Sequence, residues 1–242
     1  MNTVFLVSPH NAAELVESAE MFAEKQSTSV NGALVVIHTS GAADEARKIA
    51  NTLAPKFRAA NLIKVVGNES GLNISISTLF ARFLLSCYTK FPGPWMVIDG
   101  WTKPLVDNVF DVAMSQHRVS GAKVSGMAQT TETFTRPSGP FVMELDMKPL
   151  KFLRFPSTEP WRHRIGHVLR RMKFGHIKRE EWPFTLSKSP EAERDVKIID
   201  PNEPVDYESL DDNQLREIIR QRTGTKPHHF TKRENLLAQL TS

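Results

Sequence analysis

Residues 3–11 read TVFLVSPHN, a continuous apolar run that ends in a cluster of turn-forming residues. An uninterrupted branched run of this kind is typical of a strand buried on both faces of a parallel sheet. From Ala12 to Lys25 the apolar side chains instead recur at helical spacing. The opening of the chain therefore predicts one strand–helix unit of an α/β protein.

The same alternation continues along the first hundred residues. Further strand-like runs lie at Ala33–Ile37, Leu62–Val66 and Trp95–Ile98, and the stripes between them, at 42–53 and 74–90, are helical. This order predicts βαβ units and a mainly parallel sheet, with ligands bound outside the carboxyl ends of the strands. The chain lacks both Gly-x-Gly-x-x-Gly and Gly-x-x-x-x-Gly-Lys-Ser/Thr. A dinucleotide-binding Rossmann site and a P-loop nucleotide hydrolase are therefore disfavoured.

The pattern changes after the fourth strand. We expect a helix from Pro104 to His117, strands at 122–128 and 140–147, and a helix at 160–173. The next stretch, 183–207, is polar and contains four prolines, which is typical of a linker. A helix–turn–helix pattern follows it. We therefore expect an α/β domain at 1–182, a linker at 183–207 and a small helical module at 208–242.

Composition narrows the classes of protein further. The 242 residues include one cysteine, Cys87, which excludes an intrachain disulfide and a cysteine-based zinc finger. No apolar run reaches the roughly 18 residues that a membrane span needs, and no basic region precedes the first strand. We therefore expect no membrane partner and a cytoplasmic location, which would be the host cytoplasm for a viral protein.

Positive charge is concentrated in one segment. The whole chain carries a formal charge of +4, whereas residues 151–182 contain nine Lys/Arg and three acidic residues, a net +6. Histidine and tryptophan side chains lie among these cations. Such a segment favours a phosphate-bearing partner, and the alternative is a solvated helix face.

Residues 94–105 read PWMVIDGWTKPL, an apolar strand followed by Asp99 and then by a proline. This stretch, and the order of elements before it, resembles the metal-binding strand end of GT-A glycosyltransferases, over about residues 1 to 155. The resemblance implies a GT-A-like, Rossmann-like sheet. It also implies a nucleotide-sugar donor, with UDP the expected nucleotide, and a divalent Mn or Mg ion held by carboxylates against the diphosphate.

This chain departs from the Asp-x-Asp pattern of that family, because Trp101 occupies the second acidic position. Either the ion has one carboxylate, Asp99, or a cation such as Lys103 replaces the ion. Trp101 would stack on a sugar or base. The structural alternative is that Asp99 caps the next helix and Trp101 only packs.

Other residues complete the expected site. Donor contacts are expected from the ends of the first and third strands, at Ser8, His10, Asn11, Asn68 and Glu69. A general base for the acceptor hydroxyl is expected at Asp146 or Glu144, which lie two apart on one strand. The resemblance also implies a late histidine as metal ligand, for which His167 is the candidate. For the strand carboxylates the alternative is pairing with lysines, and for the loop residues it is turn chemistry.

The end of the chain resembles the SAP and helix-extended-helix group of small modules, many of which bind DNA. The matching residues are the Leu-x-x-x-x-Leu-Arg start at Leu210 and the Lys-Arg-Glu-Asn-Leu-Leu run at Lys232. Together with the basic segment this implies a glycosyltransferase that acts on DNA, similar to bacteriophage enzymes that glycosylate hydroxylated bases. The expected DNA contacts are Arg162, Arg164, Arg170, Arg171, Lys173, Lys226, Lys232 and Arg233.

Two other functions fit the same sequence. One is a glycosyltransferase with a protein or glycan acceptor, or a nucleotidyltransferase on a similar fold. The other is a non-catalytic nucleic-acid-binding protein whose α/β half is a scaffold.

Overall fold

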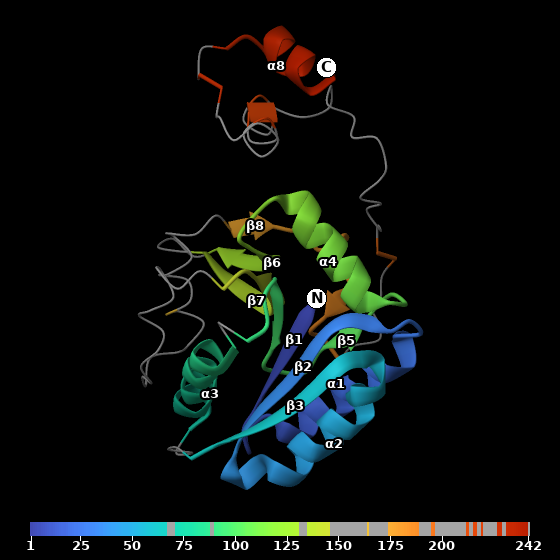
Figure 1. Ribbon diagram of the computed structural model, residues 1–242, viewed down its shortest axis with the longest axis vertical. Coiled ribbons are helices and arrows are strands. Elements are labelled where there is room, and N and C mark those ends of the chain that lie inside the picture. Colours follow the sequence, from blue (N-terminus) through green and yellow to red (C-terminus); the bar gives the residue numbers. More distant parts are fainter. Residues whose placement is uncertain are drawn as a thin grey trace. The chain divides into compact units, whose positions relative to one another are not determined.

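The chain forms a seven-stranded sheet with helices on both faces, and the fold class expected from the sequence is confirmed (Figure 1). The computed structural model describes residues 1–66, 71–87, 90–130, 135–145, 164, 174–188, 195–196, 212, 215–216, 219, 227–228 and 231–241. The chain divides into two compact units, Met1–Ile199 and Asp200–Ser242. Every helix within the described ranges is too short or too polar to span a lipid bilayer.

The sheet is built from β1 (Asn2–Val7), β2 (Val30–Thr39), β3 (Phe57–Val65), β4 (Trp95–Ile98), β6 (Val124–Thr130), β7 (Thr135–Met143) and β8 (Phe174–His176). The strand order is β3-β2-β1-β4-β7-β6-β8. The first four are parallel to one another, and β7 pairs antiparallel with both β4 and β6. The order 3-2-1-4 is that of the nucleotide-binding half of doubly wound folds.

Two apolar clusters fill the space between sheet and helices. One lies between the sheet and α3 (Leu72–Cys87), and the other lies under α1 (Ala12–Lys25), α2 (Ala43–Leu53) and α4 (Val109–Ser120). Short 3-10 turns, η1 (Ser40–Ala42) and η2 (Ala54–Lys56), flank α2. β1 and β4 are buried along their whole length, as their continuous apolar sequences predict.

The third strand begins earlier than predicted, at Phe57 instead of Leu62. β3 lies at the edge of the sheet, and most of its residues are exposed, including Leu62. Its apolar run indicated a strand correctly, but strand order decides which strands have a neighbour on both sides.

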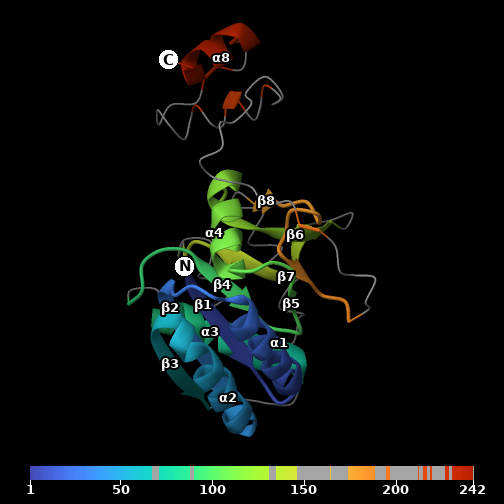
Figure 2. The same cartoon turned by 90° about the vertical axis from the view of Figure 1, so that its right-hand side faces the viewer.

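The segment after β4 also differs from its prediction. Lys103–Pro104 forms the short strand β5, and α4 begins five residues later, at Val109. Asn108 precedes α4 in the left-handed conformation, with φ of 50°. Its side-chain oxygen accepts hydrogen bonds from the backbone N–H groups of Ser27 and Thr28, at 3.1 Å each. These contacts with a distant loop fix the start of α4. Figure 2 shows α4 beside β6 and β8.

The expected linker begins too early, because residues 183–188 belong to the first unit. Phe184–Thr185 forms β9, which pairs antiparallel with β5. Trp182 and Phe184 are fully buried, and the Phe184 ring packs edge-on against Phe22 of α1, with 5.8 Å between the ring centroids. This strap (residues 182–188) is part of the core on the α1 side of the sheet.

The described part of the C-terminal unit has a small core of its own. Leu215, Ile219 and Leu236 are buried together, the last of them on α8 (Arg233–Thr241). Arg216 donates to the carbonyl oxygen of Thr231 at 2.9 Å.

Candidate functional site

Two of the segments expected to carry chemistry lie side by side. β1 and β4 are neighbours in the sheet, and the chain order reverses between them, because β2 and β3 lie on one side of β1 and β4 on the other. Such a switch point places a crevice outside the carboxyl ends of the two strands. The loops 8–11 and 99–103 begin there.

Asn11 joins these two loops directly. Its side-chain nitrogen donates to the carbonyl oxygen of Asp99 at 2.8 Å and to that of Leu6 at 2.9 Å. Its side-chain oxygen accepts from the backbone N–H and the hydroxyl of Ser8, at 2.8 and 3.1 Å. An amide side chain has two donor hydrogens and two acceptor lone pairs, so Asn11 is saturated by the protein.

The first-strand residues therefore do not share one role. Ser8 and Asn11 are buried and bonded to each other, so they shape the site instead of offering their side chains to a ligand. His10 is exposed at the tip of the same turn. Of the three, His10 is the one with an exposed side chain.

The other loop leaves the sheet and runs over α1. The backbone N–H of Thr102 donates to the hydroxyl of Ser18 at 2.8 Å. Lys103, half-buried, then enters β5 opposite Thr185 of β9. Asp99 is half-buried at the start of this loop, at the carboxyl end of β4.

Trp101 lies in the middle of the loop and is covered by charged groups. The Lys188 ammonium lies 5.4 Å from the centre of its ring and 3.0 Å from the Glu17 carboxylate on α1. The buried indole N–H forms no well-aligned hydrogen bond, yet it approaches Glu17 closely enough to lower the pKa of that carboxyl, and Lys188 lowers this pKa further. The Lys188 ammonium therefore lies over the Trp101 ring, which was expected to stack on a ligand.

Sequence reasoning missed Glu17, Ser18 and Lys188. Glu17 lies on the exposed face of the amphipathic helix α1, Ser18 is a buried polar residue of the same helix, and Lys188 falls within the expected linker. Lys188 and Glu17 are separated by 171 positions, so no local pattern indicates their pairing.

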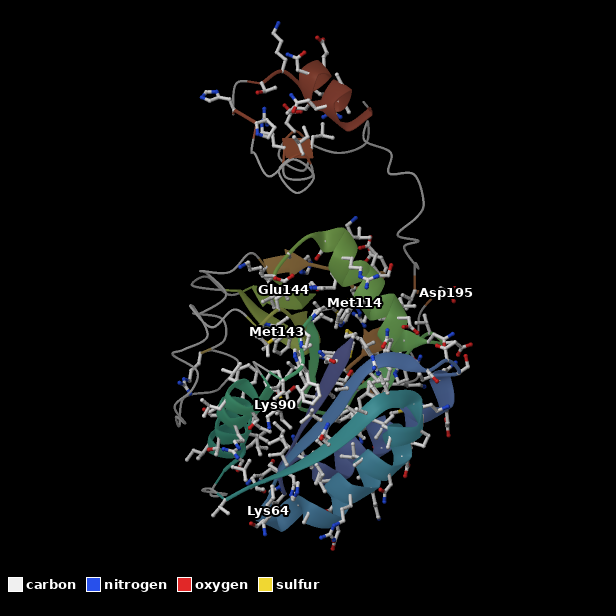
Figure 3. All side chains as sticks on the ribbon, in the orientation of Figure 1. Lys64, Lys90, Met114, Met143, Glu144 and Asp195 are labelled. Atoms are coloured by element: carbon white, nitrogen blue, oxygen red, sulfur yellow. The ribbon has the colours of Figure 1, made fainter. Side chains whose placement is uncertain are left out.

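Glu144 does not belong to this site. It follows β7, whose last residue, Met143, pairs with the first residue of β4, Trp95, whereas Asp99 follows the other end of β4. At about 3.3 Å per strand residue the two carboxylates lie roughly 16 Å apart along the strand. Lys64 lies near the carboxyl end of β3, and Figure 3 shows Glu144 toward the opposite end of the parallel strands. The antiparallel direction of β7 thus separates Glu144 from Asp99.

Glu144 instead borders a cavity at the amino end of β4. The cavity holds about 300 Å³ and is lined by Phe91, Pro92, Gly93, Pro94, Glu144 and Leu145.

Many expected contacts fall outside the described residues: Asn68, Glu69, Asp146, Arg162, His167, Arg170, Arg171, Lys173 and Lys226. Three of the expected DNA contacts are described. Arg164 donates to the hydroxyl of the buried Ser77 on α3 at 2.7 Å, and Arg233 pairs with Asp212 at 3.1 Å. Lys232 is exposed. Arg164 and Arg233 are therefore engaged within the protein.

Within the described ranges, no group of three or more histidine, cysteine or acidic side chains could hold a metal ion. The two large pKa shifts lie away from the switch point. Burial lowers the pKa of His117 to about 4, and its Nδ1 lies 2.7 Å from the Ser125 hydroxyl. Burial raises the pKa of the Cys87 thiol to about 12. Both groups are therefore neutral at pH 7.

Comparison with known proteins gives weak structural likenesses alone. No protein-family model and no curated protein matches the sequence. The chain is similar to mouse xyloside xylosyltransferase 1 (9% identity, 75% of this chain and 86% of the other, TM-score 0.47). It is similar to a nucleoside-diphosphate-sugar pyrophosphorylase from Vibrio cholerae (10%, 79% and 97%, TM-score 0.47) and to HddC from Yersinia pseudotuberculosis (10%, 73% and 89%, TM-score 0.43).

Proposed function

We propose that the first unit binds a nucleotide sugar at the switch point between β1 and β4 and transfers the sugar to an acceptor. The observation that carries this proposal is the hydrogen bond from Asn11 to the Asp99 carbonyl. It fixes the loop that bears the acidic residue against the first βα turn, where doubly wound sheets receive nucleotides. The donor is proposed to be a UDP-sugar, as the resemblance to GT-A enzymes implies.

On this proposal Asp99 contacts the diphosphate through a divalent ion. A single protein carboxylate suffices only where phosphate oxygens and water supply the remaining ligands, which is how Mg is usually bound next to nucleotides. An ion held there by Asp99 would supply positive charge against the departing nucleoside diphosphate. Lys103, four residues later, is the alternative source of positive charge, and His10 is the proposed donor contact from the first turn.

The acceptor is proposed to be a hydroxylated base in DNA. The net charge of +6 over residues 151–182 supports a polyanionic partner. A base inside a duplex is poorly accessible, so the target nucleotide would be flipped out of the helix. No general base is assigned among the described residues, because Glu144 lies at the opposite end of the strands from Asp99 and Asp146 falls outside the described ranges.

A thermal-shift titration tests donor binding. UDP and several UDP-sugars are added with and without manganese to wild-type protein and to Asp99→Asn. A ligand at one hundred times its Kd stabilises the folded state by about 2.7 kcal/mol, which corresponds to roughly 5 to 10 °C for a unit of this size. We expect that shift in wild type with manganese and a much smaller one in Asp99→Asn, with equal melting temperatures in the absence of ligand.

Two results would redirect the proposal. If no donor shifts the wild type while duplex DNA does, the chain is a nucleic-acid-binding protein whose sheet is a scaffold. If a donor binds and sugar is transferred to a protein or glycan but not to hydroxymethylated DNA, the acceptor assignment is wrong and the donor assignment stands.

A further inference from the structure

Lys188 lies at the end of the strap and contacts the loop that carries Asp99. We infer that Lys188 is a positioning residue: together with Glu17 it holds Trp101 against α1 and thereby fixes the 99–102 loop. We call these three side chains the Trp101 latch. The inference concerns the organisation of the proposed donor site, so its relevance to catalysis rests on the proposed function.

The 99–102 loop has one anchor at each end. Asn11 binds the carbonyl of Asp99, and Ser18 binds the N–H of Thr102, both at 2.8 Å and both from buried side chains. Trp101 lies between these anchors, and its contacts with Lys188 and Glu17 are the polar ones that restrain its ring. A ring that moves would turn the backbone two residues from the Asp99 carboxylate.

The strap gives Lys188 a fixed origin. β9 pairs with β5, and the N–H of Leu105 donates to the carbonyl of Pro183 at 2.9 Å. Phe184 is buried in the core between these contacts. Lys188 therefore lies three residues past a strand that is anchored in the core, and its side chain reaches back to Glu17 on α1.

The ion pair of the latch is exposed, which makes its function separable from folding. The side chains of Lys188 and Glu17 are 57% and 48% exposed. Exposed ion pairs and cation–π contacts each contribute little to global stability. A variant of Lys188 should therefore keep the fold and lose only the local restraint.

Chemical identity of the residue distinguishes this role from packing. Lys188→Met keeps an apolar stem of similar length but removes the charge that binds both Glu17 and the indole face. Lys188→Arg keeps both contacts, because a guanidinium stacks on indole and pairs with a carboxylate. Lys178→Met is the matched control, since Lys178 is an exposed lysine of the same chain segment and neither of the contacts above involves its side chain.

Hydrogen exchange of the backbone amides of residues 99–103 measures the restraint in the absence of a nucleotide-sugar donor. In Lys188→Met we expect exchange to be about three- to tenfold faster, from the loss of one ion pair and one cation–π contact. Lys188→Arg and Lys178→Met should exchange like wild type, and all four proteins should share one melting temperature. Equal exchange in Lys188→Met and wild type would overturn the inference.

Donor affinity then tests whether the restraint serves the site. Titration of UDP with manganese should show about three- to tenfold weaker binding to Lys188→Met, the same factor by which the loop is loosened, and recovery in Lys188→Arg. Faster exchange with unchanged UDP affinity would overturn the positioning role. If wild type binds no nucleotide, the proposed function fails, and the exchange measurement still decides whether Lys188 holds the loop.

Discussion

Replacing Asn11 by aspartate separates two explanations of this residue. Asn11 immediately precedes α1, where asparagine and aspartate are equally good helix N-caps. The structure instead gives its side chain a bridging role, with no capping hydrogen bond to the helix. Aspartate keeps the oxygen that accepts from Ser8 but replaces the NH₂ group that donates to Leu6 and Asp99.

The expected cost follows from the groups left unpaired. Asn11→Asp removes two hydrogen bonds of 2.9 and 2.8 Å and faces two carbonyl oxygens with a buried carboxylate. Each buried polar group that loses its partner costs about 1 to 3 kcal/mol, so we expect a loss of roughly 2 to 6 kcal/mol in the free energy of unfolding. Asn11→Ala removes both donor and acceptor and should lose a similar amount.

Urea unfolding of the wild type and both variants measures this difference, with the slope of the transition checked for constancy. Replacing the exposed neighbour, His10→Ala, is the control and should change the free energy of unfolding by less than about 0.5 kcal/mol. An Asn11→Asp protein as stable as wild type would show that Asn11 is an ordinary helix cap. The hydrogen bond from Asn11 to the Asp99 carbonyl would then not be what fixes the two loops of the proposed site.

Four further predictions concern other parts of the chain. Because the indole and ammonium neighbours lower the pKa of the Glu17 carboxyl, its ionised form stabilises the fold above the ordinary carboxyl pKa of 4.5. This stabilisation is lost as the pH falls through the lowered pKa of the folded state. The difference in the free energy of unfolding between wild type and Glu17→Gln should therefore shrink at acid pH. A chain that ends near Pro204 should keep the first unit folded, as measured by circular dichroism. Phe184→Ala in the strap should lower the free energy of unfolding by about 3 to 5 kcal/mol, because the Phe184 ring is fully buried. Arg164→Gln should lower the melting temperature and leave DNA affinity at low salt unchanged, because this side chain binds the buried hydroxyl of Ser77. Arg171→Gln should weaken DNA binding. The reverse pattern would show that Arg164 contacts DNA.

The regular elements of the first hundred residues were predictable because the spacing of apolar residues within each element indicates which of its faces is buried. The helix at Ala12–Lys25 and the strand at Trp95–Ile98 have the bounds that their apolar spacing predicts. Continuous apolar runs indicate central parallel strands, and a repeat of 3.6 residues indicates a helix with one buried face. The same local signal failed for the start of α4, where contacts of Asn108 with residues 27 and 28 determine the boundary.

Apolar spacing alone was enough to predict the class of fold, the parallel half of the sheet and the two loops at the carboxyl ends of β1 and β4. Which polar side chains meet there depends on how the elements pack in three dimensions. Asn11 and the Asp99 carbonyl are 88 positions apart, and Lys188 and Glu17 are 171 apart. Because β7 is antiparallel to β4, Glu144 lies at the opposite end of the strands from Asp99. Periodicity reports which face of an element is buried, but the partners of a loop depend on strand order and direction, which arise when distant elements pack against one another.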